Sequence, residues 1–246
     1  MSVASQVRRL LPARVQPAVR YHYERWRGLL ERELPLFCDM VQAHDLVVDV
    51  GANVGIYTHA LAKRGAAIEA FEPQPWCAEV LRAYASGNSH IRVHNIALGA
   101  ADASVVLRVP IVDGRLQRGS ASLVETDMTT PAETIDVDVR TLDSFGFDRV
   151  RAMKIDVEGA ELGVLRGAAE TIARGHPLLL VEIEQRHHAG SIDPVFAEIE
   201  SMGYRGEFLL PDRGWRPLAE FRADVHQRVS ALNGGLYINN FLFRGL

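Results

Sequence analysis

The chain contains little cysteine and no surplus of positive charge. Only two of its 246 residues are cysteines, Cys38 and Cys77, and their spacing matches no metal-binding or redox motif. We therefore expect both to be reduced, buried thiols in a cytoplasmic protein. Lys and Arg total 27 against 31 Asp and Glu, which gives a formal net charge of -4. Because nucleic-acid binding relies on a surplus of basic residues facing phosphates, we expect no nucleic-acid partner.

Long hydrophobic runs are also absent from the sequence. No segment approaches the roughly 18 consecutive apolar residues that a membrane span requires, so we expect no transmembrane segment. Residues 1–11 lack the continuous apolar core of a signal peptide. Hydrophobic residues nevertheless make up 48% of the chain, which is enough for a sizeable core and too many for a disordered protein.

Residues 1–32 differ in composition from the rest of the chain. They hold seven arginines and only two acids, Glu24 and Glu31, with apolar residues at a loose helical spacing. We favour an amphipathic helical cap with a solvated basic face over a lid, a dimer arm or a patch for an anionic membrane or carrier. The lid, the dimer arm of a homo-oligomer and the patch for an anionic membrane or carrier remain open alternatives. We divide the chain into a basic helical extension over 1–40 and one domain over 41–246.

From Leu46 onward, short apolar runs alternate with helical patterns, which is typical of parallel βαβ units. Strands are expected at 46–50, 67–71, 91–96, 104–109, 135–139, 150–155, 177–183, 204–210 and 236–243. One helix is expected to carry Leu162, Leu165, Ala169 and Ile172 on one face. The polar stretch 112–132 is expected to be a long loop. This order predicts a doubly wound α/β sheet, in which ligands bind beyond the carboxyl ends of the strands.

A glycine turn after the first strand is the strongest chemical signal. Its polar and small residues are Asp49, Gly51, Ala52, Asn53 and Gly55. A dinucleotide loop would have a third glycine, where this chain has Asn53. Asp49 would repel a pyrophosphate but could accept hydrogen bonds from a ligand ammonium group. The turn therefore favours a nucleoside that carries an amino acid, although its glycines could serve packing alone.

Glu72 ends the second strand, 23 positions after Asp49. At this place a carboxylate can accept two hydrogen bonds from ribose hydroxyls. The plain alternative is a surface acid before a Pro-Gln-Pro turn. Turn and acid together favour a nucleoside cofactor, because both lie in the βαβ context that such a fingerprint requires.

A second group of ionisable residues follows two later strands. Asp156 and Glu158 come directly after the strand at 150–155, and His187 and His188 follow the strand at 177–183. A histidine whose pKa lies near neutrality suits a general base, but either histidine could equally be a solvated loop residue. Asp156 is harder to explain structurally, because it lies where the cleft of such a sheet opens.

Seven motifs follow one another in a fixed order. They are Val-Val-Asp-Val-Gly-Ala-Asn-Val-Gly-Ile-Tyr-Thr (47–58), Glu-Pro (72–73), Asn-Ile-Ala-Leu-Gly (95–99), Thr-Leu-Asp (141–143), Met-Lys-Ile-Asp-Val-Glu-Gly-Ala-Glu (153–161), Leu-Val-Glu-Ile-Glu (180–184) and Asn-Asn-Phe-Leu-Phe (239–243). Together they resemble the FkbM family of S-adenosylmethionine-dependent methyltransferases. The resemblance spans about residues 45–245 and leaves residues 1–32 outside it.

The resemblance implies a Rossmann-like sheet of seven strands whose last strand is antiparallel, with the cofactor S-adenosylmethionine over the first strands. Its methionine part would contact Asp49, Gly51, Ala52, Asn53 and Gly55. Glu72 would hold the ribose, and the segment 95–98, with Asn95 and Ala97, would lie beside the adenine. The expected reaction is methylation of a hydroxyl group on a small-molecule or glycan acceptor, namely a sugar, a glycolipid or a polyketide-type product.

An alcohol must lose its proton as the new bond forms, which requires a base. Asp156 is the first candidate for this base or for an orienting carboxylate, His187 is the second, and Glu158 would orient the substrate. A divalent cation that bridges Asp156 with Glu184 or His187 ranks below a metal-independent reaction, because the sequence has no dedicated cation loop. Two other functions stay open: a non-catalytic module that binds the cofactor or a glycan-assembly partner, and an NAD-dependent oxidoreductase.

Overall fold

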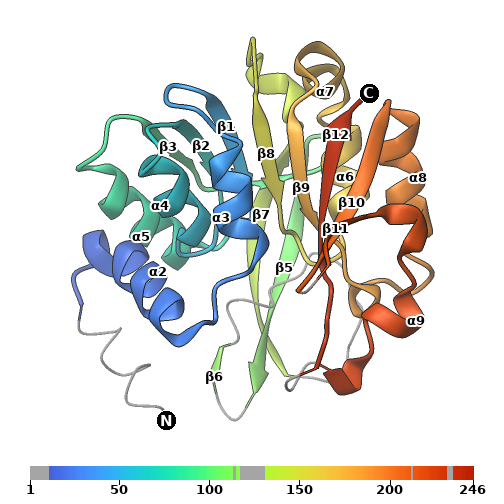
Figure 1. Ribbon diagram of the computed structural model, residues 1–246. Helices are drawn as coiled ribbons and strands as arrows, with labels where there is room; N and C mark the ends of the chain where they lie inside the picture. Colours follow the sequence, from blue (N-terminus) through green and yellow to red (C-terminus); the bar gives the residue numbers. More distant parts are fainter. Residues whose placement is uncertain (1–10, 113–114, 117–130, 212, 232–234) are drawn as a thin grey trace.

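The computed structural model describes residues 11–112, 115–116, 131–211, 213–231 and 235–246 (Figure 1). The strands are β1 (Leu46–Val50), β2 (Ala67–Phe71), β3 (Ile91–His94), β4 (Ala97–Leu98), β5 (Ala103–Val112), β6 (Arg115–Leu116), β7 (Ala132–Arg140), β8 (Ala152–Ile155), β9 (Leu178–Glu182), β10 (Tyr204–Leu210), β11 (Gly214–Pro217) and β12 (Asn240–Gly245). The helices are α2 (Gln16–Arg27), α3 (Glu33–Asp39), α4 (Ile56–Ala62), α5 (Pro75–Ala85), α6 (Glu161–Arg166), α7 (Ala169–Gly175), α8 (Asp193–Ser201) and α9 (Ala223–His226).

The main sheet has the order β11-β10-β12-β9-β8-β1-β2-β3. Strands β3, β2, β1, β8 and β9 pair in parallel, and β12, the last strand of the chain, is antiparallel to both β9 and β10. The sheet thus contains the seven strands with an antiparallel last strand that we expected, and β11 adds an eighth at the edge, antiparallel to β10. The order reverses between β1 and β8, so the ligand crevice of such a sheet lies at their carboxyl ends.

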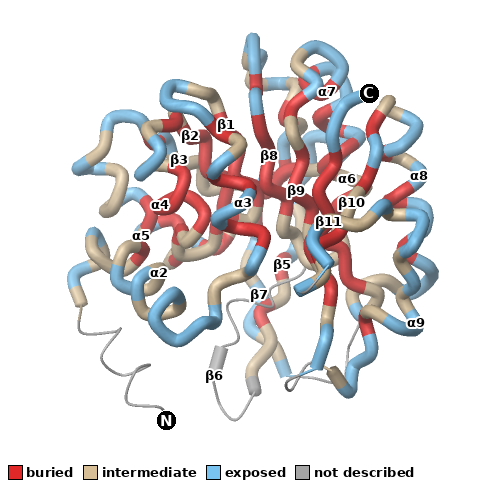
Figure 2. Tube along the Cα trace, in the orientation of Figure 1, coloured by how far each residue is buried: buried red, intermediate tan, exposed pale blue. Residues whose placement is uncertain are grey.

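Helices cover both faces of this sheet. Consecutive residues of a strand point to opposite faces, and accordingly Val47 packs with α3, α4 and α5, while Val48 packs with α6, α7 and α8. The central strands are buried except at some of their end residues, as near-continuous apolar runs predict (Figure 2). These buried layers fix the strand ends, and with them the turns that follow.

The strands between Ala97 and Arg140 form a second, small sheet with the order β4-β7-β5-β6. Strands β5 and β7 pair antiparallel over eight positions, from Ala103 opposite Val139 to Pro110 opposite Ala132. Both strands are longer than the expected 104–109 and 135–139. Most of the stretch 112–132, which we expected to be a long loop, lies outside the described residues.

Several other expected elements also differ in their bounds, since β3, β8 and β9 are shorter than the expected 91–96, 150–155 and 177–183. The single helix expected after β8 is two helices, α6 and α7, which are separated at Gly167. A Cβ atom on Gly167 would lie 1.9 Å from the backbone oxygen of Gly99, so the chain bends where the two backbones meet. The last strand begins at Asn240 rather than at Leu236. The apolar sequence pattern begins before the strand, because residues such as Ile238 are buried but do not pair in the sheet.

Candidate active site

Two adjoining pockets open at the carboxyl ends of β1, β2 and β8. The first is called the apolar pocket and is lined by Phe71, Glu72, Ile96, Ala97, Leu98 and Leu107, among others. The second is called the acidic pocket and is lined by Glu31, Asp49, Lys154, Glu182, Glu184 and Tyr237, among others. Gly51, Asn53, Asp156 and Glu158 line both pockets. The two cavities therefore meet at the glycine turn after β1 and at the end of β8.

The glycine turn is held against both neighbouring strands. The backbone N–H groups of Gly51 and Ala52 donate to the Phe71 carbonyl oxygen at 2.9 and 3.1 Å. Gly51 has a φ of 77° and Gly55 a φ of 85°, a region that favours glycine. A Cβ atom on Gly55 would lie 2.6 Å from Leu81 Cδ2. Packing alone thus requires glycine at this position, and the same turn also lines the acidic pocket.

Glu72 links the turns after β1 and β2. Its side chain is buried, Oε2 accepts a hydrogen bond from the Asn53 N–H at 2.7 Å, and Oε1 accepts one from the Gln74 N–H at 2.8 Å. Burial raises the pKa of this carboxyl to about 7, although both hydrogen bonds oppose the shift. Each oxygen keeps a second lone pair, so the group can still accept hydrogen bonds from a ligand.

Asn95 and Ala97 hold different positions relative to the apolar pocket. The Asn95 Nδ2 donates to the backbone oxygens of Glu72 and Pro73, both at 2.9 Å. Among the described residues, Asn95 does not line the pocket but fixes the backbone that carries Glu72. Ala97 begins β4, is buried and lines the pocket directly.

Asp49 lies at the inner wall of the acidic pocket and is 1% exposed. Its Oδ2 accepts a hydrogen bond from Thr58 Oγ1 at 2.6 Å. Burial raises the pKa of this carboxyl to about 6, while the Thr58 hydrogen bond and the Lys154 ammonium lower it. A cation in this pocket would stabilise the ionised carboxylate further.

Lys154 is a buried cation that our sequence analysis did not single out. It lies on β8, opposite Asp49 in the parallel pairing with β1, and is 1% exposed. Its Nζ donates to Asn240 Oδ1 at 3.0 Å and lies 3.7 Å from Glu182 Oε2 and 4.0 Å from Asp156 Oδ2. A lysine is rarely buried inside an apolar strand unless it has a charged or polar partner. The lysine at position 154 of the apolar run could therefore have indicated a buried polar site.

Glu31 joins the N-terminal extension to the acidic pocket. Its Oε2 accepts hydrogen bonds from the Tyr57 hydroxyl at 2.5 Å and from Asn240 Nδ2 at 3.1 Å. Glu31 and Asn240 are 209 positions apart in the sequence. Nothing in the local sequence pattern could place them together.

Asp156 and Glu158 follow β8 and face both pockets. The Asp156 side chain is 33% exposed, and its desolvation raises the pKa to about 7 although Lys154 lowers it. Glu158 has a φ of 52° and is followed by Gly159 at a φ of 101°. This left-handed turn directs the strand end toward the pockets. The structure therefore brings both predicted carboxylates to the junction of the two cavities.

His187 lies behind Glu158. Its Nε2 is in contact with Glu158 Oε2 and lies 3.9 Å from Glu184 Oε1. His187 is not one of the described residues that line the two pockets. His188 makes a separate contact, 3.1 Å from Glu161 Oε2. The two histidines thus each face a carboxylate of the β8 loop.

Glu184 and its partners form the outer wall of the acidic pocket. Arg186 Nε and Nη2 donate to the Glu184 carboxylate at 2.7 and 2.8 Å, and the Tyr237 hydroxyl donates to Oε2 at 2.7 Å. Burial opposes ionisation of Glu184, but these hydrogen bonds outweigh it and lower the pKa to about 2. This wall is therefore charged and fixed in geometry.

Two further observations bear on ligands and membranes. Within the described ranges, no group of three or more His, Cys, Asp and Glu side chains could hold a metal ion. In the same part of the chain, none of the helices combines the length and the apolar character that a bilayer crossing needs.

Known proteins show similarity over most of the chain. A family model described as Methyltransferase FkbM domain matches residues 49–205. Methyltransferase 1 of Beauveria bassiana (strain ARSEF 2860) is 29% identical over 202 residues, which cover 70% of this chain and 76% of that protein. Methyltransferase sdnD of Sordaria araneosa is 26% identical over 228 residues, with 77% and 82% covered.

A solved structure shares the fold. The crystal structure of methyltransferase FkbM from Methylobacillus flagellatus KT superposes with a TM-score of 0.52 at 22% sequence identity. The match covers 88% of this chain and 45% of that chain, so this chain spans less than half the length of that protein. At this identity, the likeness concerns the architecture of the sheet and its helices.

Proposed function

The chain belongs to the FkbM methyltransferase family, and on that premise we propose that it transfers a methyl group from S-adenosylmethionine to a hydroxyl oxygen. The acceptor class that we propose is a small molecule or glycan: a sugar, a glycolipid or a polyketide-type product. One observation carries the proposal: an apolar pocket and an acidic pocket meet at Gly51, Asn53, Asp156 and Glu158. A ligand that is apolar at one end and cationic at the other fits such a pair.

The residues present fit this cofactor. Phe71, Leu98 and Leu107 offer an apolar enclosure for adenine, and Glu72 at its edge would accept hydrogen bonds from the ribose hydroxyls. Asp49 would face the ammonium group of the methionine part in the acidic pocket. When bound, S-adenosylmethionine supplies a methyl group on a sulfonium centre. A sulfonium is a cation, and the carboxylates of the acidic pocket match its charge.

The Asp156 carboxylate is our candidate for the base. Its pKa near 7 leaves a large fraction ionised at neutral pH, so it can take the acceptor hydroxyl proton as the new bond forms. Glu158 would orient the acceptor through a hydrogen bond. His187 would act through Glu158, because it contacts that carboxylate rather than the pocket. We thus assign His187 a positioning role rather than that of a base.

The outer part of the acidic pocket would hold the acceptor. Its wall consists of Glu184, Arg186, Tyr237 and Asn239. The Arg186 guanidinium donates a hydrogen bond to the Glu184 carboxylate, and the Tyr237 ring has an apolar face and a polar hydroxyl. A hydroxyl-bearing substrate would find both hydrogen-bond donors and hydrogen-bond acceptors at this wall, which supports O-methylation over methylation of an apolar carbon.

The N-terminal extension would complete this pocket. Arg20, Glu24 and Leu29 line it from α2 and the turn that follows, and Glu31 reaches Tyr57 and Asn240. We propose a division into an extension over 1–40 and a domain over 41–246, in which described residues of the extension, such as Leu29 and Glu31, close the acidic pocket. The helical cap would then also shape the acceptor site.

Calorimetric titration with S-adenosylhomocysteine tests the function, with NAD as the control ligand. We expect micromolar affinity, about -8 kcal/mol, that Asp49→Asn and Glu72→Gln each weaken by about tenfold or more. Folded protein that binds NAD but not S-adenosylhomocysteine would establish the oxidoreductase instead. Binding without methyl transfer to any hydroxylated acceptor, and without an effect of Asp156→Asn, would point to the non-catalytic module.

A further inference from the structure

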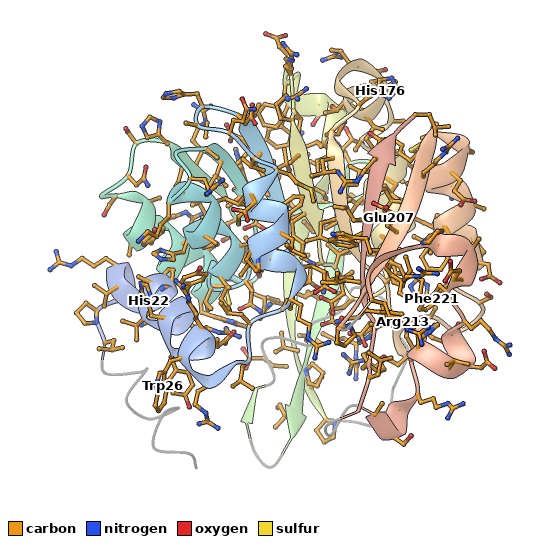
Figure 3. All side chains as sticks on the ribbon, in the orientation of Figure 1. His22, Trp26, His176, Glu207, Arg213 and Phe221 are labelled. Carbon is orange, nitrogen blue, oxygen red and sulfur yellow. The ribbon has the colours of Figure 1, made fainter. Side chains whose placement is uncertain are left out.

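Exposed apolar side chains gather at the edge of the molecule where the acidic pocket opens. Trp26 at the end of α2 is 80% exposed, and Leu29 in the next turn is 60% exposed. Figure 3 shows Trp26 at the lower end of α2, directed away from the domain. Leu29 also lines the acidic pocket. One rim of this pocket therefore presents a large aromatic and an aliphatic side chain to solvent.

A segment near the C-terminus adjoins this rim. Leu236 is 41% exposed. Leu30 and Arg32 line one hollow together with Leu236, so the two segments lie side by side. Exposed apolar side chains that gather in one region mark interaction sites more often than scattered ones. We call Trp26, Leu29 and Leu236 the apolar rim.

Exposed arginines flank the apolar rim. They are Arg25, Arg27 and Arg32. Within the described residues none of them forms an ion pair, whereas Arg20 of α2 does. The whole chain carries a net charge of -4, so this edge is basic against the general balance of the protein. Its field favours an anionic partner.

We propose that this edge docks on an anionic lipid membrane, with the apolar rim inserted at the headgroup level and the arginines on the lipid phosphates. Tryptophan and arginine are suited to this interface, since the ring is amphipathic and each basic residue near the surface adds attraction to anionic lipid. The docking itself is independent of the reaction. That the acceptor is carried in or on this membrane rests on the proposed function.

Vesicle co-sedimentation tests the docking with the full chain. We expect binding to vesicles of equal parts phosphatidylglycerol and phosphatidylcholine, and little binding to phosphatidylcholine alone. The double variant Arg25→Glu/Arg27→Glu should weaken partitioning by about 25-fold or more, since each basic residue contributes about fivefold. Trp26→Ala should weaken it by about tenfold. Raising the salt from about 0.1 M to about 1 M should release the protein, because the screening length falls from about 10 Å to about 3 Å.

Matched controls lie at the opposite end of the molecule. Arg149 precedes β8 and is exposed, and Leu246 at the C-terminus is 78% exposed (Figure 1). Arg149→Glu and Leu246→Ala should leave vesicle binding unchanged. All variants should bind S-adenosylhomocysteine as the parent protein does, because none of these residues lines the apolar or the acidic pocket. A failure of cofactor binding would therefore not affect the test of docking.

Tryptophan fluorescence places the contact at Trp26. In the variant Trp76→Phe/Trp215→Phe, which keeps Trp26 as the single tryptophan, anionic vesicles should shift the emission to the blue. Equal binding to both kinds of vesicle, or binding that none of the rim variants weakens, would overturn the proposal. So would a doubled mass in light scattering that Trp26→Ala returns to the monomer, because a second copy would then cover the rim.

Discussion

A Cβ atom on Gly51 would lie 1.8 Å from the backbone oxygen of Asp156. The turn after β1 therefore approaches the end of β8 so closely that only glycine fits. The same contact places the two candidate halves of the active site, cofactor turn and catalytic carboxylate, next to each other. Packing and function thus require the same residue.

The first prediction concerns Gly51→Ala. The clash and a φ of 77° should cost more than about 3 kcal/mol of unfolding free energy and abolish S-adenosylhomocysteine binding. Gly146→Ala is the matched control, with a φ of 63° and no atom within 4 Å of the added Cβ. It should cost only about 1 kcal/mol, the backbone strain alone. Urea unfolding and calorimetry of both variants measure this, and equal losses would contradict it.

The second prediction concerns the stability of Asp49→Asn. The pKa of Asp49 is about 6 in the folded chain against about 3.9 in an unfolded one, so folding takes up a proton between these values. The resulting stability is present in full below about pH 4 and is lost as the pH rises through about 6. Asparagine removes the buried charge while it can still accept the Thr58 hydrogen bond.

Urea unfolding at two pH values checks this. At about pH 7.5 the variant should be more stable than the parent by about 1–3 kcal/mol, and at about pH 4 the gain should vanish. Asp138→Asn, on an exposed position of β7, should change stability by less than about 0.5 kcal/mol at either pH. A gain that does not depend on pH would show that the burial of charge is not its cause.

The third prediction concerns Lys154→Met. The Lys154 ammonium lowers the pKa of both Asp49 and Asp156, so its loss leaves those carboxylates without their buried cation. We expect a loss of about 1–3 kcal/mol at about pH 8 and a smaller loss at about pH 5.5, where the acids can neutralise by protonation. Exposed Lys63→Met serves as the control in the same unfolding experiment. A larger loss at the lower pH would contradict this account.

The fourth prediction concerns the pH dependence of ligand affinity. Asp49, Glu72 and Asp156 have pKa values of about 6, 7 and 7, and a cationic ligand favours their ionised forms. Affinity for S-adenosylmethionine should therefore rise between about pH 5.5 and 8 and then level off. S-adenosylhomocysteine lacks the sulfonium charge and should show the shallower rise. Calorimetry in buffers of different ionisation enthalpy should also detect proton release on binding.

The fifth prediction separates His187 from His188. Removal of His187 should weaken S-adenosylhomocysteine binding only through Glu158, so His187→Ala and Glu158→Ala should be non-additive by about 0.5–3 kcal/mol. His188→Ala removes the comparable contact with Glu161, which lies outside the lining of both pockets, and should leave binding unchanged. Additive effects of the first pair would mean that His187 touches the ligand itself.

The sequence alone sufficed for those parts of the site that depend on local pattern. The apolar runs predicted β1 and β2 with their observed bounds, because a strand covered on both faces has few polar residues. The glycines at 51 and 55 predicted a turn after β1, and both have a positive φ, which glycine adopts readily. Glu72 was placed at the end of β2 by the same reasoning, although its two backbone hydrogen bonds were not foreseen.

Tertiary structure decided which side chains meet across the pockets. Lys154 and Asn240 are 86 positions apart and Glu31 and Asn240 are 209 apart, so only the packing of distant segments brings them together. The strand pattern could not decide whether His187 faces the pocket or Glu158, and the structure places its ring against Glu158. Periodicity and turn chemistry act over a few residues, and they determined the strands of the sheet and the glycine turn after β1. The positions of the charged groups in the acidic pocket depend on contacts between distant chain segments, which only the folded arrangement provides.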